Sequence, residues 1–231
     1  MERLVLMEVY VMSKYRFCYA KEDGVKYVSH LDFIRTVERA MKRGHFPVAH
    51  SQGFNPHPSM AVAVPLSVGL TSKCEYMDIG FDEPMDNLEE LKERFNAVLP
   101  EGFHILEIKD LEKEELAKFK FIDIGEYEIY VEYDGKTLPD IEKFMGQEEI
   151  VIPKRSKKGL SDVDIKPLIH EFYIKEQNDF SLIFFAKIAA GQVNLKPQLI
   201  ITALCKYQPE FHGEFLSARR LKLISSEKVC F

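Results

Sequence analysis

Apolar and polar residues follow two different periods along the first half of the chain. They alternate between Lys14 and Ala20, as in a half-buried strand, whereas the apolar residues after Ser29 recur at the spacing of a helix. Continued along the chain, the pattern predicts helices at residues 29–44 and 86–99 and strands at residues 14–20, 60–66, 75–81 and 103–108. This order, βαββαβ, is that of a ferredoxin-like unit.

The first predicted helix has clear start and stop signals. Ser29 can cap its start by accepting a backbone N–H, and Asp32 adds negative charge at the positive end of the helix dipole. Gly44 ends the helix. In the second helix, Asp86 is the expected cap. The buried face of the first helix is expected to consist of Phe33, Ile34, Val37, Ala40 and Met41.

The second half of the chain repeats the same order of elements without sequence identity to the first. A strand that begins at residues 149–152 is expected to be interrupted at residues 153–162 and to resume at residues 164–174. The other elements are strands at residues 127–133, 180–188 and 219–224 and helices at residues 138–145 and 197–205. We therefore expect an α+β protein with two tandem ferredoxin-like subdomains, at residues 12–110 and 121–231, joined by a charged linker.

A polar loop, SQGFNPHP, follows the first helix. It contains two prolines that fix the chain direction and a glycine that permits a positive φ or a close approach to a ligand. Such a loop can be a rigid connector that packs Phe54 into the core, or it can carry binding residues. The residues that we single out for binding are Ser51, Gln52, Gly53, Phe54, Asn55 and His57, together with His30 and Glu75 nearby.

Two groups of basic residues are candidates for phosphate contacts. Arg35, Arg39, Lys42 and Arg43 share the outer face of the first helix. Lys154, Arg155, Lys157 and Lys158 lie in the segment that interrupts the second half. Either group can equally be a solvated surface. If the halves pair about a pseudo-twofold axis, the polar loop and the basic segment would border one groove.

Composition and charge narrow the classes of protein to which the chain can belong. Of its 231 residues, 46% are hydrophobic and 29% are charged, as in an ordinary globular protein. The formal net charge of −6 means that any nucleic acid must bind to a local patch. No apolar run is long enough to span a bilayer, and the N-terminus is a poor secretion signal. Met12 offers an alternative start, which would make residues 1–11 an extension.

The cysteines and histidines do not form a recognisable catalytic or metal-binding motif. Four well-separated cysteines without a C-x-x-C pair predict no zinc or iron–sulfur site and suit a reducing cytoplasm. His30, His50 and His57 match no metal-binding spacing, so we predict no metal and no cofactor. The chain lacks a nucleophile elbow, a phosphate-binding loop and a dinucleotide fingerprint, and we predict no catalytic residue.

The stretches SHLDFIRTVERAMKRG and SQGFNPHPSMAVAVPLSVGLTSKCEYMDI resemble the signature of the radical SAM-linked domain family. The resemblance is specific from Tyr15 to Asp78 and weaker beyond. It differs at Ser59, where the family usually has a basic residue. Members are bacterial and occur beside, or fused to, cobalamin-binding radical S-adenosylmethionine proteins. The resemblance therefore implies such a protein as a partner, and RNA-processing and ribosomal genes in the neighbourhood imply an RNA-related substrate.

Three hypotheses about function follow. The first is a cytoplasmic, non-catalytic accessory protein that binds an RNA or ribosome-related substrate for a radical S-adenosylmethionine partner. The second is an enzyme with its site at His50–His57, Glu75 and Asp78. The third is a purely structural adaptor between proteins.

Overall fold

The structure, a computed structural model, describes residues 12–156 and 159–231, so the extension at residues 1–11 lies outside the described part. The α-helices are α1 (His30–Arg43), α2 (Leu88–Val98), α3 (Ile141–Met145) and α4 (Pro197–Tyr207). The strands are β1 (Ser13–Lys21), β2 (Met60–Val62), β3 (Thr71–Phe81), β4 (Phe103–Asp110), β5 (Ile122–Tyr133), β6 (Val151–Ser156), β7 (Gly159–Asp164), β8 (Ile169–Gln177), β9 (Ser181–Ala189) and β10 (Gly213–Ser225).

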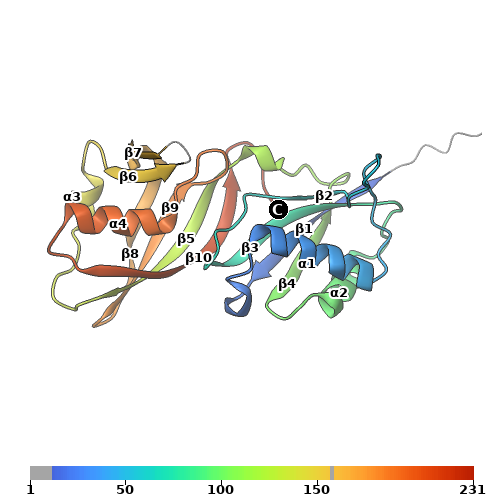
Figure 1. Cartoon of the computed structure of the whole chain (residues 1–231), viewed down its shortest axis with the longest axis horizontal. Helices are drawn as coiled ribbons and strands as arrows, with labels where there is room; N and C mark the ends of the chain where they lie inside the picture. The colour runs from blue at the N-terminus through green and yellow to red at the C-terminus, as the bar shows by residue number, and fades with distance from the viewer. Residues whose placement is uncertain (1–11, 157–158) are drawn as a thin grey trace, which may run out of the picture.

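One large, mostly antiparallel sheet runs through both halves of the molecule (Figure 1). Its strand order is β4-β1-β3-β10-β5-β9-β8, and the short β2 pairs with β3. The two halves meet where β10 pairs in parallel with β3, at Arg219 opposite Thr71 and Arg220 opposite Ser72. The fold is therefore a mixed α and β architecture in which the sheet continues across the junction.

Each half has its own hydrophobic core between the sheet and its helices. In the first half, Tyr15, Phe17 and Tyr19 of β1 pack against apolar residues of α1 and α2, including Phe33 and Phe95. In the second half, alternate residues of β5 and β9 pack against α3 and α4. Figure 1 shows α1, α2 and α4 in front of the strands, on the same side of the sheet.

The opposite face of the first half is covered by the segment after β4 and by the C-terminal residues. Arg16 of β1 fastens both to the sheet. Its guanidinium forms a two-point ion pair with Asp78, at 2.8 and 2.9 Å. It also donates to the carbonyl oxygens of Ala117, at 2.7 Å, and Cys230, at 3.0 Å, and lies 4.3 Å from the ring centroid of Phe119. This buried arginine thus holds together three parts of the chain that are far apart in sequence.

The first helix agrees with its sequence signals, and the second differs slightly. The Ser29 side chain accepts the backbone N–H of Asp32, at 3.2 Å, and Gly44 is the C-cap of α1, which confirms both predictions. In α2 the cap is Asn87, whose side chain accepts from Glu90 N at 3.1 Å, and not Asp86.

The strands β3, β5 and β10 begin four to six residues earlier than predicted, and two other strand predictions fail more seriously. The strand expected at residues 60–66 ends at Val62, because Pro65 has no backbone N–H to donate. At Thr71 and Ser72, β3 pairs with β10 instead. In the second half, the expected interrupted strand is a separate hairpin followed by a new strand. β6 and β7 pair with each other from Val151–Asp164 to Ser156–Gly159, and β8 begins only at Ile169. The second half therefore has two more strands than predicted.

Candidate functional site

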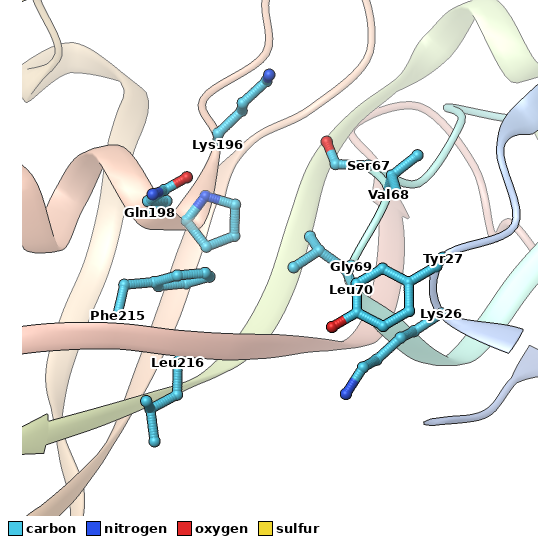
Figure 2. A pocket seen from close by; sticks show the side chains of 11 residues that line it. Lys26, Tyr27, Ser67, Val68, Gly69, Leu70, Lys196, Gln198, Phe215 and Leu216 are labelled. Carbon is cyan, nitrogen blue, oxygen red and sulfur yellow. The ribbon is translucent and has the colours of Figure 1, made fainter. Parts of the chain in front are cut away.

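A cavity of about 230 Å³ opens at the surface where the two halves meet (Figure 2). This volume is just below the usual range of about 300–1,000 Å³ for small-molecule pockets. Four separate segments line it: the loop before α1, the turn before β3, the start of α4 and one part of β10. The lining residues are Lys26, Tyr27, Ser67, Val68, Gly69, Leu70, Lys196, Pro197, Gln198, Phe215 and Leu216. We call this cavity the junction pocket.

Lys21 and Gly69 position the first-half wall of the junction pocket. The ammonium of the buried Lys21 donates to the carbonyl oxygens of Lys26, at 3.1 Å, and Val28, at 2.9 Å. Burial lowers the pKa of Lys21. Gly69 also donates its N–H to Lys26 O, at 2.9 Å, and adopts a φ of +87° that favours glycine. These contacts hold the short segment that carries Tyr27, a residue that is 73% exposed.

The second-half wall is built around the first turn of α4. Pro197 occupies the first turn, as its sequence predicts, and Lys196 is the N-cap residue. Leu195 is buried and donates its N–H to Ala189 O, at 3.0 Å, which fixes the entry to the helix. Phe215 of β10 lies below Gln198 in Figure 2. The second-half wall therefore combines the apolar side chains of Pro197 and Phe215 with the basic side chain of Lys196.

The polar groups of the junction pocket are mostly free to bind a ligand. The Tyr27 hydroxyl, the Ser67 hydroxyl, the Lys196 ammonium and the Gln198 amide line the pocket, and none has a hydrogen-bond or ion-pair partner among the described residues. Lys26 differs, because its ammonium contacts Asp23 at 3.0 Å and lies 5.3 Å from the centroid of the Tyr27 ring. No carboxylate belongs to the described lining. The pocket thus offers two cations and several donors next to aromatic walls.

A buried ion pair lies at the junction, on the helix side of the sheet. Arg220 of β10 donates to both carboxylate oxygens of Glu75 of β3, at 2.9 Å, and both side chains are almost completely buried. Arg220 also donates to the Tyr127 hydroxyl and to Val64 O, at 2.9 Å each. Desolvation raises the pKa of Glu75, and the charge of Arg220 counteracts that rise. Glu75, which we predicted as a binding residue, therefore ties the halves together.

Of the other predicted binding residues, His30 lies close to Glu75. Both line a second, much smaller cavity of about 20 Å³, together with Lys21 and Tyr19. A volume of this size holds about one water molecule. The basic face of α1 is exposed: Arg35 pairs with Asp32 of the same helix, and Arg43 donates to Val98 O of α2, whereas Arg39 and Lys42 are exposed to solvent. None of these residues lines the junction pocket.

The polar loop forms a closed projection. Ser51 N donates to His57 O, at 2.8 Å, and His57 N donates to the Ser51 hydroxyl, at 3.0 Å. Phe54 at its tip is fully exposed, which rules out the connector interpretation in which Phe54 packs into the core. Gly53 has a φ of +151°, and Gln52 and Asn55 are also exposed.

The predicted groove between the polar loop and the basic segment does not form. Lys154 and Arg155 lie on β6, but their side chains are outside the part of the chain that the structure describes. Lys157 and Lys158 lie outside it altogether. Figure 1 shows β6 and β7 near one end of the long axis and β2, which directly follows the polar loop, in the other half. The expectation of a shared groove was wrong because the halves join edge to edge through β3 and β10.

The groups of the alternative enzymatic site are also kept apart. Asp78 pairs with Arg16 on the face that the C-terminal residues cover, whereas Glu75 pairs with Arg220 on the helix side. His50 contacts its own neighbour, Val48 O, at 2.7 Å. Among the described residues, no group of three or more His, Cys, Asp and Glu side chains is arranged to hold a metal ion. The described helices include none that is long and apolar enough to cross a membrane.

Sequence reasoning missed the junction pocket. Tyr27 stands just before the Ser29 cap, Ser67 and Gly69 lie in the stretch that carries the family resemblance, and Lys196 precedes a helix-starting proline. Each of these residues is unremarkable in its own segment. The only local signal was the unexplained aromatic at Tyr27, between a glycine turn and a helix cap.

Comparisons with known proteins identify a family and two distant structures. A family model described as "Uncharacterized protein conserved in bacteria (DUF2344)" matches residues 14–197. No curated protein matches the chain. A chain in the crystal structure of a Cbf5-Nop10-Gar1 complex is similar with 9% identity and a TM-score of 0.48, over 91% of this chain and 48% of that one. This chain thus spans about half the length of that neighbour. An unknown protein from Galdieria sulphuraria is similar with 15% identity and a TM-score of 0.27, over 92% and 100% of the two chains.

Proposed function

The chain belongs to the DUF2344 family, and we propose that it is an accessory protein that binds single-stranded RNA, with one nucleotide in the junction pocket. In this proposal the protein itself has no catalytic residue, and it presents the RNA to a radical S-adenosylmethionine partner. The observation that carries the proposal is that the Lys196 ammonium and several polar donors in the junction pocket have no partner among the described residues and lie beside aromatic walls.

The charge of the junction pocket favours an anionic ligand. The whole chain has a formal net charge of −6, yet the described lining of the pocket contains Lys196, Lys26, which is paired with Asp23 outside the lining, and no carboxylate. A local positive charge on an acidic protein favours an anionic ligand that binds at this pocket. It does not attract polyanions to the rest of the surface. A phosphate bound at Lys196, whose ammonium has no partner among the described residues, fits this pattern.

The apolar part of the pocket favours a planar group next to that phosphate. The exposed ring of Tyr27 and the half-buried ring of Phe215 come from opposite walls. Proteins bind single-stranded RNA by stacking its bases on such aromatic rings, and hydroxyl and amide groups read the base edges. Ser67 and Gln198 supply those groups here.

We also propose that each half is a ferredoxin-like unit, at residues 12–110 and 121–231. The strand order β4-β1-β3-β2 in the first half and β10-β5-β9-β8 in the second supports this, with one helix after the first strand and another before the last strand of each unit. The β6–β7 hairpin is then an insertion in the second unit. On this view the junction pocket is a feature of the fused pair that neither unit has alone.

Titration of the full chain against a fluorescently labelled single-stranded RNA, followed by anisotropy at two salt concentrations, tests the proposal. We expect Lys196→Glu to weaken binding about tenfold and to lower the salt dependence by about one ion, as for a lost phosphate contact. Lys42→Glu is the matched control, because Lys42 is an exposed lysine on the basic face of α1. No RNA binding by the wild type, or equal losses in both variants, would contradict the proposal.

The adaptor hypothesis has one observation in its favour. Phe54 is a fully exposed aromatic at the tip of a loop that its own hydrogen bonds close, and exposed aromatics of this kind anchor protein interfaces. If the chain is an adaptor, Phe54→Ala abolishes a stable complex with the radical S-adenosylmethionine protein, and RNA has no effect on that complex. Analytical size-exclusion chromatography of the two proteins, with and without RNA, separates the two functions.

A further inference from the structure

Two cysteine thiols face each other across neighbouring strands of the sheet. Cys18 of β1 and Cys74 of β3 have their sulfur atoms 3.9 Å apart. They lie in a small apolar cluster with Tyr76 and Cys230, on the face that the C-terminal residues cover. Cys18 is buried, and Cys74 is partly exposed to solvent. Neither thiol belongs to the junction pocket or to the Glu75–Arg220 pair.

The surroundings make the two thiols chemically unequal. The Cys74 sulfur is 2.9 Å from the Tyr76 hydroxyl, so a thiolate at Cys74 accepts hydrogen bonds from both Cys18 and Tyr76. The hydrogen bond from Cys18, followed by that from Tyr76, outweighs desolvation and lowers the pKa of Cys74 to about 7. The same contact with Cys74, together with burial, raises the pKa of Cys18 well above its ordinary value. Cys74 is therefore the nucleophile, and Cys18 remains a thiol.

We propose that Cys74 is an oxidation site and that Cys18 resolves it to a disulfide, with a peroxide as the oxidant. The Cys74 thiolate attacks one oxygen of the peroxide, the O–O bond breaks, and one alcohol or water molecule leaves as Cys74 becomes a sulfenic acid. The Cys18 thiol then attacks the Cys74 sulfur, the S–O bond of the sulfenic acid breaks, and the thiol proton leaves with the hydroxyl group as water. In total, two thiols lose two electrons and two protons, and the peroxide is reduced by the same two electrons.

The backbone next to Cys74 can accommodate the bond. The sulfur atoms must approach from 3.9 Å to about 2.05 Å, the length of a disulfide. The register between β1 and β3 is irregular here, since Tyr19 faces Glu75 but Lys21 faces Ser72. One extra residue of β3 therefore lies beside Ala20, and such a bulge lets a strand shift locally.

The oxidation site adjoins the junction in sequence. Cys74 is next to Glu75, whose carboxylate binds Arg220 on the other face of the sheet. A disulfide from Cys74 to Cys18 fastens β3 to β1 at the point where β3 also meets β10. We expect the oxidised protein to have a higher Tm than the reduced protein, because the bond closes a long loop in the unfolded chain.

The test treats the full chain with hydrogen peroxide and follows it by intact-mass and peptide mass spectrometry. The wild type is expected to lose the mass of two hydrogen atoms and to yield a linked Cys18–Cys74 peptide. In Cys18→Ser, a dione probe for sulfenic acid should label Cys74, with no disulfide. Cys205→Ser is the control, because Cys205 donates to Gly213 O on the other half of the molecule and should not alter the product. Absence of the linked peptide in the wild type, or a link from Cys74 to Cys230, overturns the proposal.

A second measurement needs no substitution and so does not depend on a variant that folds. Iodoacetamide alkylation of the reduced wild type is followed at each cysteine by peptide mass spectrometry over a range of pH. The rate at Cys74 should rise with a midpoint near pH 7 and exceed the rate at Cys18 more than tenfold at neutral pH. Equal rates at Cys74 and Cys18 overturn the assignment of Cys74 as the nucleophile.

Discussion

The polar loop at residues 51–58 and the junction pocket are built in opposite ways. The loop is one continuous segment, closed by hydrogen bonds between Ser51 and His57, and it exposes its side chains. The pocket gathers four segments from both halves, and a buried ion pair at the same junction keeps the halves together. This difference shows that a run of polar residues in the sequence can reveal a loop formed by one segment. A pocket formed by four distant segments cannot be recognised from any one of them.

The two regions also differ in what their side chains depend on. Phe54 at the loop tip contacts solvent whatever the rest of the molecule does. Tyr27 faces Phe215 only while the seam between β3 and β10 is intact. Changes at the junction should therefore affect both stability and binding, and changes in the loop should affect neither.

The largest effect is expected for Glu75→Ala, which leaves the Arg220 guanidinium buried without its counter-charge. Removal of one partner of a buried pair typically costs about 3–5 kcal/mol. Urea unfolding followed by circular dichroism measures the free energy of unfolding. Glu132→Ala, an exposed glutamate of β5, is the control and should change it by less than about 0.5 kcal/mol. A loss below about 1 kcal/mol for Glu75→Ala would show that the seam does not depend on this pair.

Next in size is the comparison of the two exposed aromatics. Tyr27→Ala should weaken binding of single-stranded RNA about tenfold, because one base loses its stacking partner. Phe54→Ala is the matched variant in the loop and should leave the affinity unchanged. Anisotropy titrations of both variants, with thermal unfolding to confirm the fold, make the comparison. If Phe54→Ala weakens RNA binding and Tyr27→Ala does not, the RNA site lies at the polar loop and not in the junction pocket.

A smaller effect is expected for Lys21→Met, which removes the donor to Lys26 O and Val28 O. The partly buried Val28 O then loses this donor and Lys26 O keeps only the Gly69 N–H, so the free energy of unfolding should fall by about 1–3 kcal/mol. RNA affinity should fall as well, because the segment that carries Tyr27 is no longer held. Unfolding and binding are measured on the same preparation, and a loss of stability without any loss of affinity would argue against this positioning role.

The smallest effect is expected for Ser51→Ala. The variant removes the acceptor for His57 N, but that amide is at the surface and can bond to water. We expect no measurable change in Tm or in RNA affinity, and faster hydrogen exchange at the His57 amide alone. Slower binding or a lower Tm would mean that the closed loop is coupled to the rest of the fold.

Local chemistry determined what could be predicted from the sequence. The Ser29 cap, the Gly44 end and the buried face of α1 depend on side chains within one helix, and they are found as expected except that Ile34 is only partly buried. The cap of α2 moved by one residue to Asn87, because neighbouring residues compete for the same role. The β6–β7 hairpin was missed because its two strands read as one interrupted strand until they pair with each other.

The sequence by itself determined the helices, most of the strands and the exposed, proline-stiffened loop, because caps, periodicity and turn residues act over a few neighbouring positions. Only the tertiary structure decided that β10 pairs with β3, that Glu75 is buried against Arg220 and that Tyr27, Ser67, Lys196 and Phe215 line one pocket. Those decisions rest on contacts between residues far apart in the chain, where the burial of one charge is favourable only if its partner arrives from the other half.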